Sequence, residues 1–198
     1  MAIAAPQPRV LADVVAQTWV RNLALVVGGA AFVGLSAQVF FYLPWNPAVP
    51  VTLQTFAVIL TAGALGSVRG VLAMLVYAVA GVVGVPWFAE ASSGYSAPSF
   101  GYIIGFIVAA FVVGRIAEHG ATRNFAKSMG LMLLGSVIIY AIGATWLKFN
   151  LGIPWFGADS AWAYGVKDFI VGDVIKLIAA AGLLPLAWKG LRKAGLTG

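Results

Sequence analysis

Charge and cysteine are both scarce in this chain of 198 residues. Only 9% of its residues are charged and 62% are hydrophobic, whereas a soluble domain carries about 25% charged residues. Cysteine is absent, which excludes disulfide and thiolate chemistry. A single histidine, His119, and six scattered acidic residues do not supply the clustered ligands of a metal site. The composition indicates an integral membrane protein, and we expect no metal.

Sequence motifs for nucleotide binding and hydrolysis are also missing. The chain contains no G-x-x-x-x-G-K-[ST], so it has no P-loop with which to bind ATP. It contains neither H-E-x-x-H nor G-x-S-x-G, the motifs of zinc proteases and serine hydrolases. We therefore expect that the protein is not an enzyme and has no cofactor.

Six apolar segments follow one another along the chain. We expect an all-α integral membrane protein with six transmembrane helices, because a span needs roughly 20 apolar residues and fewer when it is shielded from lipid. A short N-terminal interfacial segment at about 1–21 and a bundle over about 22–190 would form one membrane domain, 1–198. The segments are 22–43, 51–65, 71–85, 102–113, 129–146 and 169–188.

The second and third segments are separated only by a short stretch around Arg69. This arginine is flanked by Gly66 and Gly70 and is the one charge between Val51 and Phe88. Glycine and a charge inside an apolar run are typical of a turn. We expect a helix hairpin that turns at Arg69.

Basic residues predict the orientation. With the N-terminus inside, nine Lys and Arg residues fall in the inner loops, while only Lys148 and Lys167 fall in the outer loops. Such a bias is typical of cytoplasmic loops. Both termini are therefore expected in the cytoplasm of a multi-pass cell-membrane protein. Because the positive charge is spread over short loops beside the lipid bilayer, it does not indicate nucleic-acid binding.

Asp173 and Lys176 are charged residues inside the last apolar segment. A charge within a span costs at least about 2.5–3.5 kcal/mol and usually faces the protein interior, where it has a function. Three residues apart on a helix, the two side chains share one face and can pair. They are either a ligand-binding pair or a buried ion pair that only fixes helix packing.

The outer loops are rich in aromatic residues, including Trp87, Tyr95 and Trp155. Aromatic residues at this depth are often anchors in the membrane interface. They also form the walls of small-molecule pockets. Both interpretations are open, and the second places the pocket on the side of Asp173 and Lys176.

Ala30 and Gly34 lie four residues apart in the first span. Small residues at this spacing allow close helix approach. They either pack inside the bundle or form a surface that couples to a partner membrane protein.

Five segments together resemble the BioY family, the biotin-binding subunits of energy-coupling-factor (ECF) transporters. In chain order they are Val-Pro-Val-Thr-Leu-Gln-Thr at 49–55, Gly-Ser-Val-Arg-Gly at 66–70, Gly-Val-Pro-Trp-Phe-Ala at 84–89, Pro-Ser-Phe-Gly-Tyr-Ile-Ile-Gly-Phe at 98–106, and Gly-Asp-Val-Ile-Lys at 172–176. The resemblance implies a six-helix subunit that captures biotin on the outer side. It also implies two kinds of partner, a transmembrane coupling protein and a pair of ABC-type ATPases.

The chemistry of biotin suits the same residues. Asp173 is an acceptor for a ureido N–H, and charge-assisted bonds are stronger than neutral ones. Lys176 would meet either the carboxylate or the ureido carbonyl. For Gln54, a hydrogen bond between helices is an equal alternative to ligand binding. The candidate substrate-binding residues are Asp173, Lys176, Gln54, Thr52, Ser93, Tyr102, Trp87, Tyr95 and Trp155.

A second function remains open at this point. The chain could be a self-sufficient carrier coupled to protons, with Asp173 as the proton site. The missing P-loop does not separate this possibility from the first, since a capture subunit also depends on ATPases outside the chain.

Overall fold

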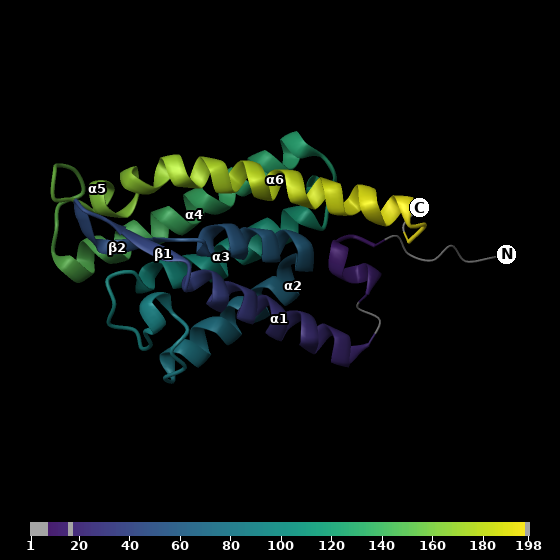
Figure 1. Ribbon diagram of the computed structural model, residues 1–198, viewed down its shortest axis with the longest axis horizontal. Coiled ribbons are helices and arrows are strands. Elements are labelled where there is room, and N and C mark those ends of the chain that lie inside the picture. Colours follow the sequence, from purple (N-terminus) through teal and green to yellow (C-terminus); the bar gives the residue numbers. More distant parts are fainter. Residues whose placement is uncertain (1–7, 16–17, 197–198) are drawn as a thin grey trace.

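The helices of the computed structural model run side by side along its long axis (Figure 1). Residues 8–15 and 18–196 are described, so much of the expected interfacial segment (1–7 and 16–17) lies outside them, as do residues 197–198. Within the described residues, five helical stretches are long and apolar enough to cross a membrane. They contain α1 (Trp19–Ala37), α2 (Gln54–Val82), α3 (Phe100–Ala117), α4 (Phe125–Leu151) and α6 (Ile170–Lys193).

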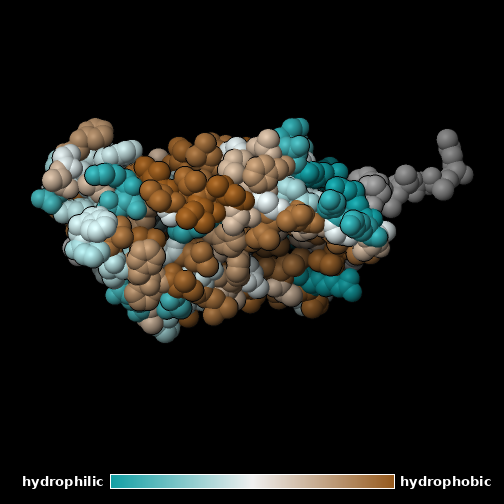
Figure 2. Space-filling view, turned by 45° about the horizontal axis from the view of Figure 1, so that its top comes forward, coloured by the Kyte–Doolittle hydropathy of each residue, from teal (hydrophilic) through white to brown (hydrophobic). Residues whose placement is uncertain are grey.

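Short elements cover the two ends of the bundle. They are η1 (Leu11–Val14), β1 (Phe40–Leu43), β2 (Asn46–Thr52), η2 (Ala89–Ala91), η3 (Ala121–Arg123), α5 (Ala161–Gly165) and η4 (Lys167–Phe169). The β-strands and α5 lie at one end, whereas η1 and the end of α6 lie at the other (Figure 1). Apolar residues cover the middle of the molecule and hydrophilic residues gather at both ends (Figure 2). This pattern suits a bilayer around the middle.

Helix α2 is two helical arms joined by a sharp bend at Gly66. The backbone there has φ 83° and ψ 179°, a conformation that glycine adopts much more readily than other residues. The arms, 54–65 and 67–82, fold back on each other. This is shown by the hydrogen bond of 2.8 Å that Gln54 Nε2 donates to Tyr77 Oη. In a straight helix these two residues would be about 35 Å apart.

The predicted helix hairpin is therefore present, but its turn is at Gly66 and not at Arg69. Arg69 lies in the first turn of the second arm, where the backbone is helical. The bend packs tightly against α3. A Cβ atom added at Gly114 would lie 2.4 Å from the backbone nitrogen of Ser67 and 2.5 Å from the carbonyl carbon of Gly66.

A β-hairpin replaces the end of the first expected helix. Helix α1 stops at Ala37, and β1 pairs antiparallel with β2, with Phe40 opposite Thr52. The expected helix over 22–43 is therefore wrong at its C-terminal end, and the protein is not all-α. Three prolines in the segment 44–50 lack the backbone N–H that a helix requires, and aromatic residues such as those of β1 favour strands.

Buried Asn46 holds this hairpin in place. Its Nδ2 donates to the backbone oxygen of Tyr164 at 2.8 Å and to Asp168 Oδ2 at 3.1 Å. Both acceptors belong to the α5–η4 region. The hairpin is thereby tied across the end of the bundle to the segment that leads into α6.

Ala30 and Gly34 lie on the inner face of α1. Ala30 is fully buried, and a Cβ atom at Gly34 would lie 3.1 Å from the Trp87 ring. In this structure the two residues serve packing inside the bundle, the alternative to a partner-coupling surface. The spacing of small residues indicated that another group approaches this helix closely. It did not indicate which face of the helix that group meets.

The contact between α3 and the bend predicts that Gly114→Ala will destabilise the protein. The added methyl group meets rigid backbone, and overpacking of this kind typically costs about 1–3 kcal/mol. Thermal unfolding in detergent measures it, and each kcal/mol corresponds to a fall in Tm of about 2–4 °C. Gly130→Ala is the matched control, since no described atom outside the helix backbone lies within 4 Å of a Cβ atom there. A Tm for Gly114→Ala equal to that of the control would contradict the tight bend.

Candidate functional site

A cavity lies at the end of the bundle that carries the β-hairpin. Side chains from β2, both arms of α2, the loop before α3, and the helices α3, α4 and α6 converge on it. Its lining comprises Val49, Pro50, Thr52, Gln54, Thr55, Tyr77, Phe88, Ala89, Ser92, Ala97, Ser99, Phe100, Tyr102, Ile103, Phe106, Tyr140, Phe169, Asp173 and Lys176.

Asp173 and Lys176 form an ion pair in this cavity. Lys176 Nζ lies 2.7 Å from Asp173 Oδ1, and the side chains are 14% and 6% exposed, respectively. Asp173 is in the first turn of α6, where the positive end of the helix dipole favours a carboxylate. Lys176 Nζ also donates to the backbone oxygen of Thr52 at 2.8 Å. The ammonium group therefore links α6 to the end of β2.

Two further residues bind the Asp173 carboxylate. Thr55 Oγ1 donates to Oδ1 at 3.3 Å, and the Tyr140 hydroxyl donates to Oδ2 in a short hydrogen bond. A carboxylate has about four acceptor positions, so Asp173 can still accept a hydrogen bond from a ligand. Thr55 and Tyr140 were not among the predicted site residues. Tyr140, a polar aromatic within an apolar segment, was the available signal in the sequence.

Thr52, Gln54 and Tyr102 line the cavity as predicted, but each is already engaged. Gln54 Oε1 accepts from Thr52 Oγ1 at 3.2 Å, while its Nε2 joins the two arms of α2 through Tyr77. The Tyr102 hydroxyl donates to the backbone oxygen of Gly165 at 2.7 Å. For Gln54, the alternative of a hydrogen bond between helices describes this structure.

The aromatic walls are formed by different residues from those predicted. Phe88, Phe100 and Phe169 line the cavity. Phe100 and Phe88 are neighbours, with ring centroids 6.4 Å apart. Phe88 follows Trp87 directly in the loop, so the sequence located this wall to within one residue.

Trp87, Tyr95 and Trp155 are outside the cavity lining. Trp87 packs behind it, where its Nε1 donates to the backbone oxygen of Tyr77 at 3.0 Å. Tyr95 is 66% exposed. Trp155 lines an apolar groove between α4 and α6, with Lys148 Nζ 5.8 Å from its ring centroid. In this arrangement the three side chains do not line the cavity, so a role as ring walls stays a prediction.

Ser93 is also outside the cavity. Its side chain is exposed, whereas the preceding residue, Ser92, lines the cavity. The Ser92 hydroxyl donates to the backbone oxygen of Ala89 at 2.6 Å. The sequence placed a serine of this loop near the site but gave no basis for choosing between neighbours.

Comparison with known proteins agrees with this architecture. The family model described as the BioY family matches residues 7–193. This chain belongs to the BioY family. It is 38% identical over 152 residues to the biotin transporter BioY of Thermotoga maritima, covering 75% of this chain and 85% of that protein. It is 35% identical over 174 residues to the biotin transporter BioY of Rhodobacter capsulatus, covering 80% and 88%.

A solved structure shares the fold. It is the crystal structure of the S-component for biotin from an ECF-type ABC transporter. The alignment has a TM-score of 0.76 and covers 86% of this chain and 92% of that one, at 24% sequence identity. At this identity the likeness shows that the BioY-family chain described here has the same fold.

Proposed function

We propose that this chain captures biotin at the outer face of the cell membrane, as the substrate-specific subunit of an ECF-type transporter. One observation carries the proposal: a buried ion pair, Asp173–Lys176, opens onto an aromatic-walled cavity. The chain around it resembles proteins that are named biotin transporters. An acceptor and a donor in an apolar cavity are the groups that a polar, ring-containing vitamin requires.

The contacts suggest how biotin is held. The Asp173 carboxylate receives a ureido N–H in the acceptor position that Thr55, Tyr140 and Lys176 leave open. Lys176 Nζ has three donors, two of which are used by Asp173 and the Thr52 carbonyl. The third is directed to the carboxylate or the ureido carbonyl of biotin. The apolar ring system packs between the walls of Phe88, Phe100 and Phe169.

The membrane arrangement is proposed to have six spans. Helices α1, α3, α4 and α6 supply four, and the arms 54–65 and 67–82 of α2 supply two. Residues 8–15 and the end of α6 lie at the same end of the bundle (Figure 1). That end also carries most of the basic loop residues, which supports a cytoplasmic location for it. The cavity then faces outward.

The energy for transport would come from partner proteins. As a capture subunit without a P-loop, the chain would depend on an ATPase pair, and a coupling protein in the membrane would link the two. The outward face of α1 is the proposed coupling surface, because Ala24 and Gly28 are exposed there four residues apart. No described atom outside the helix backbone lies within 4 Å of a Cβ atom at Gly28. A partner helix can therefore approach closely.

Substitution of the ion pair tests the function. Asp173→Asn and Lys176→Ala should each weaken biotin binding by about 30-fold or more, since each leaves a desolvated charge unpaired. The loss of binding free energy in the double variant should be smaller than the sum of the two single losses, because the residues share one network. Calorimetric titration of the purified protein measures the affinities, with thermal unfolding as a check on folding.

Two residues outside the cavity supply controls for this experiment. Tyr95→Ala and Trp155→Ala should leave the affinity for biotin within about twofold of the parent value, because substitution of exposed side chains usually has a small effect. Parental affinity in folded Asp173→Asn and Lys176→Ala variants would overturn the proposal.

Orientation can be tested with single cysteines, since the chain has none of its own. Ser93→Cys lies in an exposed loop at the cavity end, and Asn124→Cys lies in an exposed turn at the basic end. A membrane-impermeant maleimide added to intact cells should label the first but not the second. Labelling of the second alone would reverse the topology and place the cavity inside.

The proposed coupling surface predicts a variant that still binds biotin but no longer transports it. Gly28→Trp should abolish biotin uptake with the coupling protein and ATPases present, while binding to the purified subunit stays within about twofold. Gly130→Trp, an exposed glycine on α4, is the control and should retain uptake. Normal uptake by Gly28→Trp would show that this face of α1 does not meet the partner.

A further inference from the structure

A second cleft lies at the opposite end of the molecule from the cavity. It runs between α1 and the second arm of α2, and residues 8–15 cross its end. Buried Val26 and Leu65 form part of its floor, and more exposed apolar side chains border it. The exposed apolar members of its lining are Leu23, Val68, Leu72 and Val76.

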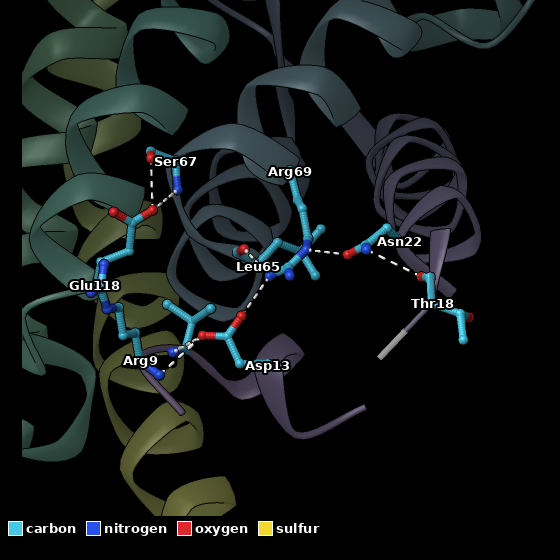
Figure 3. Close-up of polar contacts among 9 residues, drawn as sticks. Arg9, Asp13, Thr18, Asn22, Leu65, Ser67, Arg69 and Glu118 are labelled. Carbon is cyan, nitrogen blue, oxygen red and sulfur yellow. Dashed lines mark hydrogen bonds and ion pairs between the residues drawn. The ribbon is translucent and has the colours of Figure 1, made fainter. Parts of the chain in front are cut away.

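Three arginines gather where this apolar cleft reaches the basic end of the molecule. Arg69 is held in place: its Nη1 lies 2.8 Å from Asp13 Oδ1, and its Nε donates to Asn22 Oδ1 at 2.6 Å (Figure 3). Its Nη2 has no acceptor among the described residues. Arg9 and Arg115 complete the set.

Most of the hydrogen-bond donors of the Arg9 and Arg115 side chains have no acceptor among residues 8–15 and 18–196. The Arg9 guanidinium makes no hydrogen bond to the part of the chain that the structure describes. Within the described part of the chain, the Arg115 guanidinium uses only Nη1, at 3.0 Å from Glu118 Oε2, and its side chain is 60% exposed. Guanidinium groups present a fork of donors that matches a phosphate.

The cleft has a net positive charge. Burial alone would raise the pKa of Asp13, but hydrogen bonds from Arg69 and from the backbone N–H groups of Val10 and Arg9 outweigh it and lower the pKa. Glu118 is similar, since hydrogen bonds from Ser67 and Arg115 outweigh burial. Both carboxylates are ionised at neutral pH, so three guanidinium groups face two carboxylates.

We propose that this cleft binds an anionic glycerophospholipid of the leaflet at the basic end. The phosphate bonds to the spare donors of Arg9, Arg69 and Arg115, and an acyl chain follows Leu23 and Leu72 toward the middle of the bilayer. A free anion would leave these apolar walls uncovered, and a zwitterionic lipid would not match the excess positive charge. That this leaflet is the cytoplasmic one rests on the proposed function; the binding site itself does not.

The bound lipid joins three separate segments of the chain. Arg9 belongs to the N-terminal segment, Arg69 to the second arm of α2, and Arg115 to the end of α3. All three line the cleft, as does Ser67, which directly follows the Gly66 bend. There Glu118 Oε1 accepts hydrogen bonds from the backbone nitrogen and hydroxyl of Ser67 at 2.8 and 2.7 Å. Lipid binding therefore stabilises the bend region, and its effect on thermal unfolding can be measured without biotin.

Thermal unfolding of the delipidated full-length protein in detergent tests this site. Added dioleoylphosphatidylglycerol should raise Tm by about 5 °C or more at saturation, because it binds only the folded state. Dioleoylphosphatidylcholine and inorganic phosphate should raise it much less. The double variant Arg9→Gln/Arg115→Gln should lose the rise, yet should match the parent in Tm without lipid and in biotin affinity.

The double variant Arg192→Gln/Lys193→Gln is the control. It removes the same charge from exposed positions near the end of α6, outside the cleft, and should retain the full rise. An equal rise in both double variants would overturn the site. An equal rise with phosphatidylcholine or with inorganic phosphate would overturn an anionic lipid as the occupant. Because biotin affinity is measured separately, failure here is distinguishable from failure of the proposed function.

Discussion

The ion pair between Asp173 and Lys176 determines how the cavity end of the protein must be built. Two charges removed from water are stable only when hydrogen bonds satisfy their remaining capacity. Here the required groups come from distant parts of the chain: the carbonyl of Thr52, the hydroxyl of Thr55 and the hydroxyl of Tyr140. Strand β2, the first arm of α2, and α4 must therefore converge on the start of α6.

The rest of the cavity end can be understood from this requirement. The β-hairpin delivers the Thr52 carbonyl, and Asn46 fixes the hairpin to the segment before α6. Gln54 and Tyr77 hold the two arms of α2 together beside the cavity. The tight packing of Gly114 on the Gly66 bend then holds the same two arms at the opposite end. The α2 hairpin is thus fixed at both of its ends.

Much of this arrangement could be predicted from residue type and spacing. Asp173 and Lys176 stand out because charge is rare in apolar segments, and three-residue spacing on a helix brings them together. The α2 hairpin was predicted from glycine and charge, but the bend is at Gly66 because a positive φ favours glycine there over the adjacent residues. The β-hairpin was missed since Phe40–Leu43 is apolar like α1, and Gln38 is the one polar residue between Ala37 and Phe40.

Other features depend on tertiary packing. Spacing showed that Ala30 and Gly34 allow close approach, but the approaching group is Trp87 from the same chain and not a partner. Trp87 and Phe88 are adjacent aromatic residues in one loop, and only the path of the backbone decides that Phe88 lines the cavity. Tyr140 becomes significant only when α4 is seen beside Asp173.

A structure of the purified protein determined with biotin tests the central claim most directly. We predict a polar atom of biotin within about 3.2 Å of an Asp173 carboxylate oxygen or of Lys176 Nζ. The ring system should lie among Phe88, Phe100 and Phe169. Biotin bound elsewhere, for example in the groove between α4 and α6, with the ion pair untouched, would contradict the account.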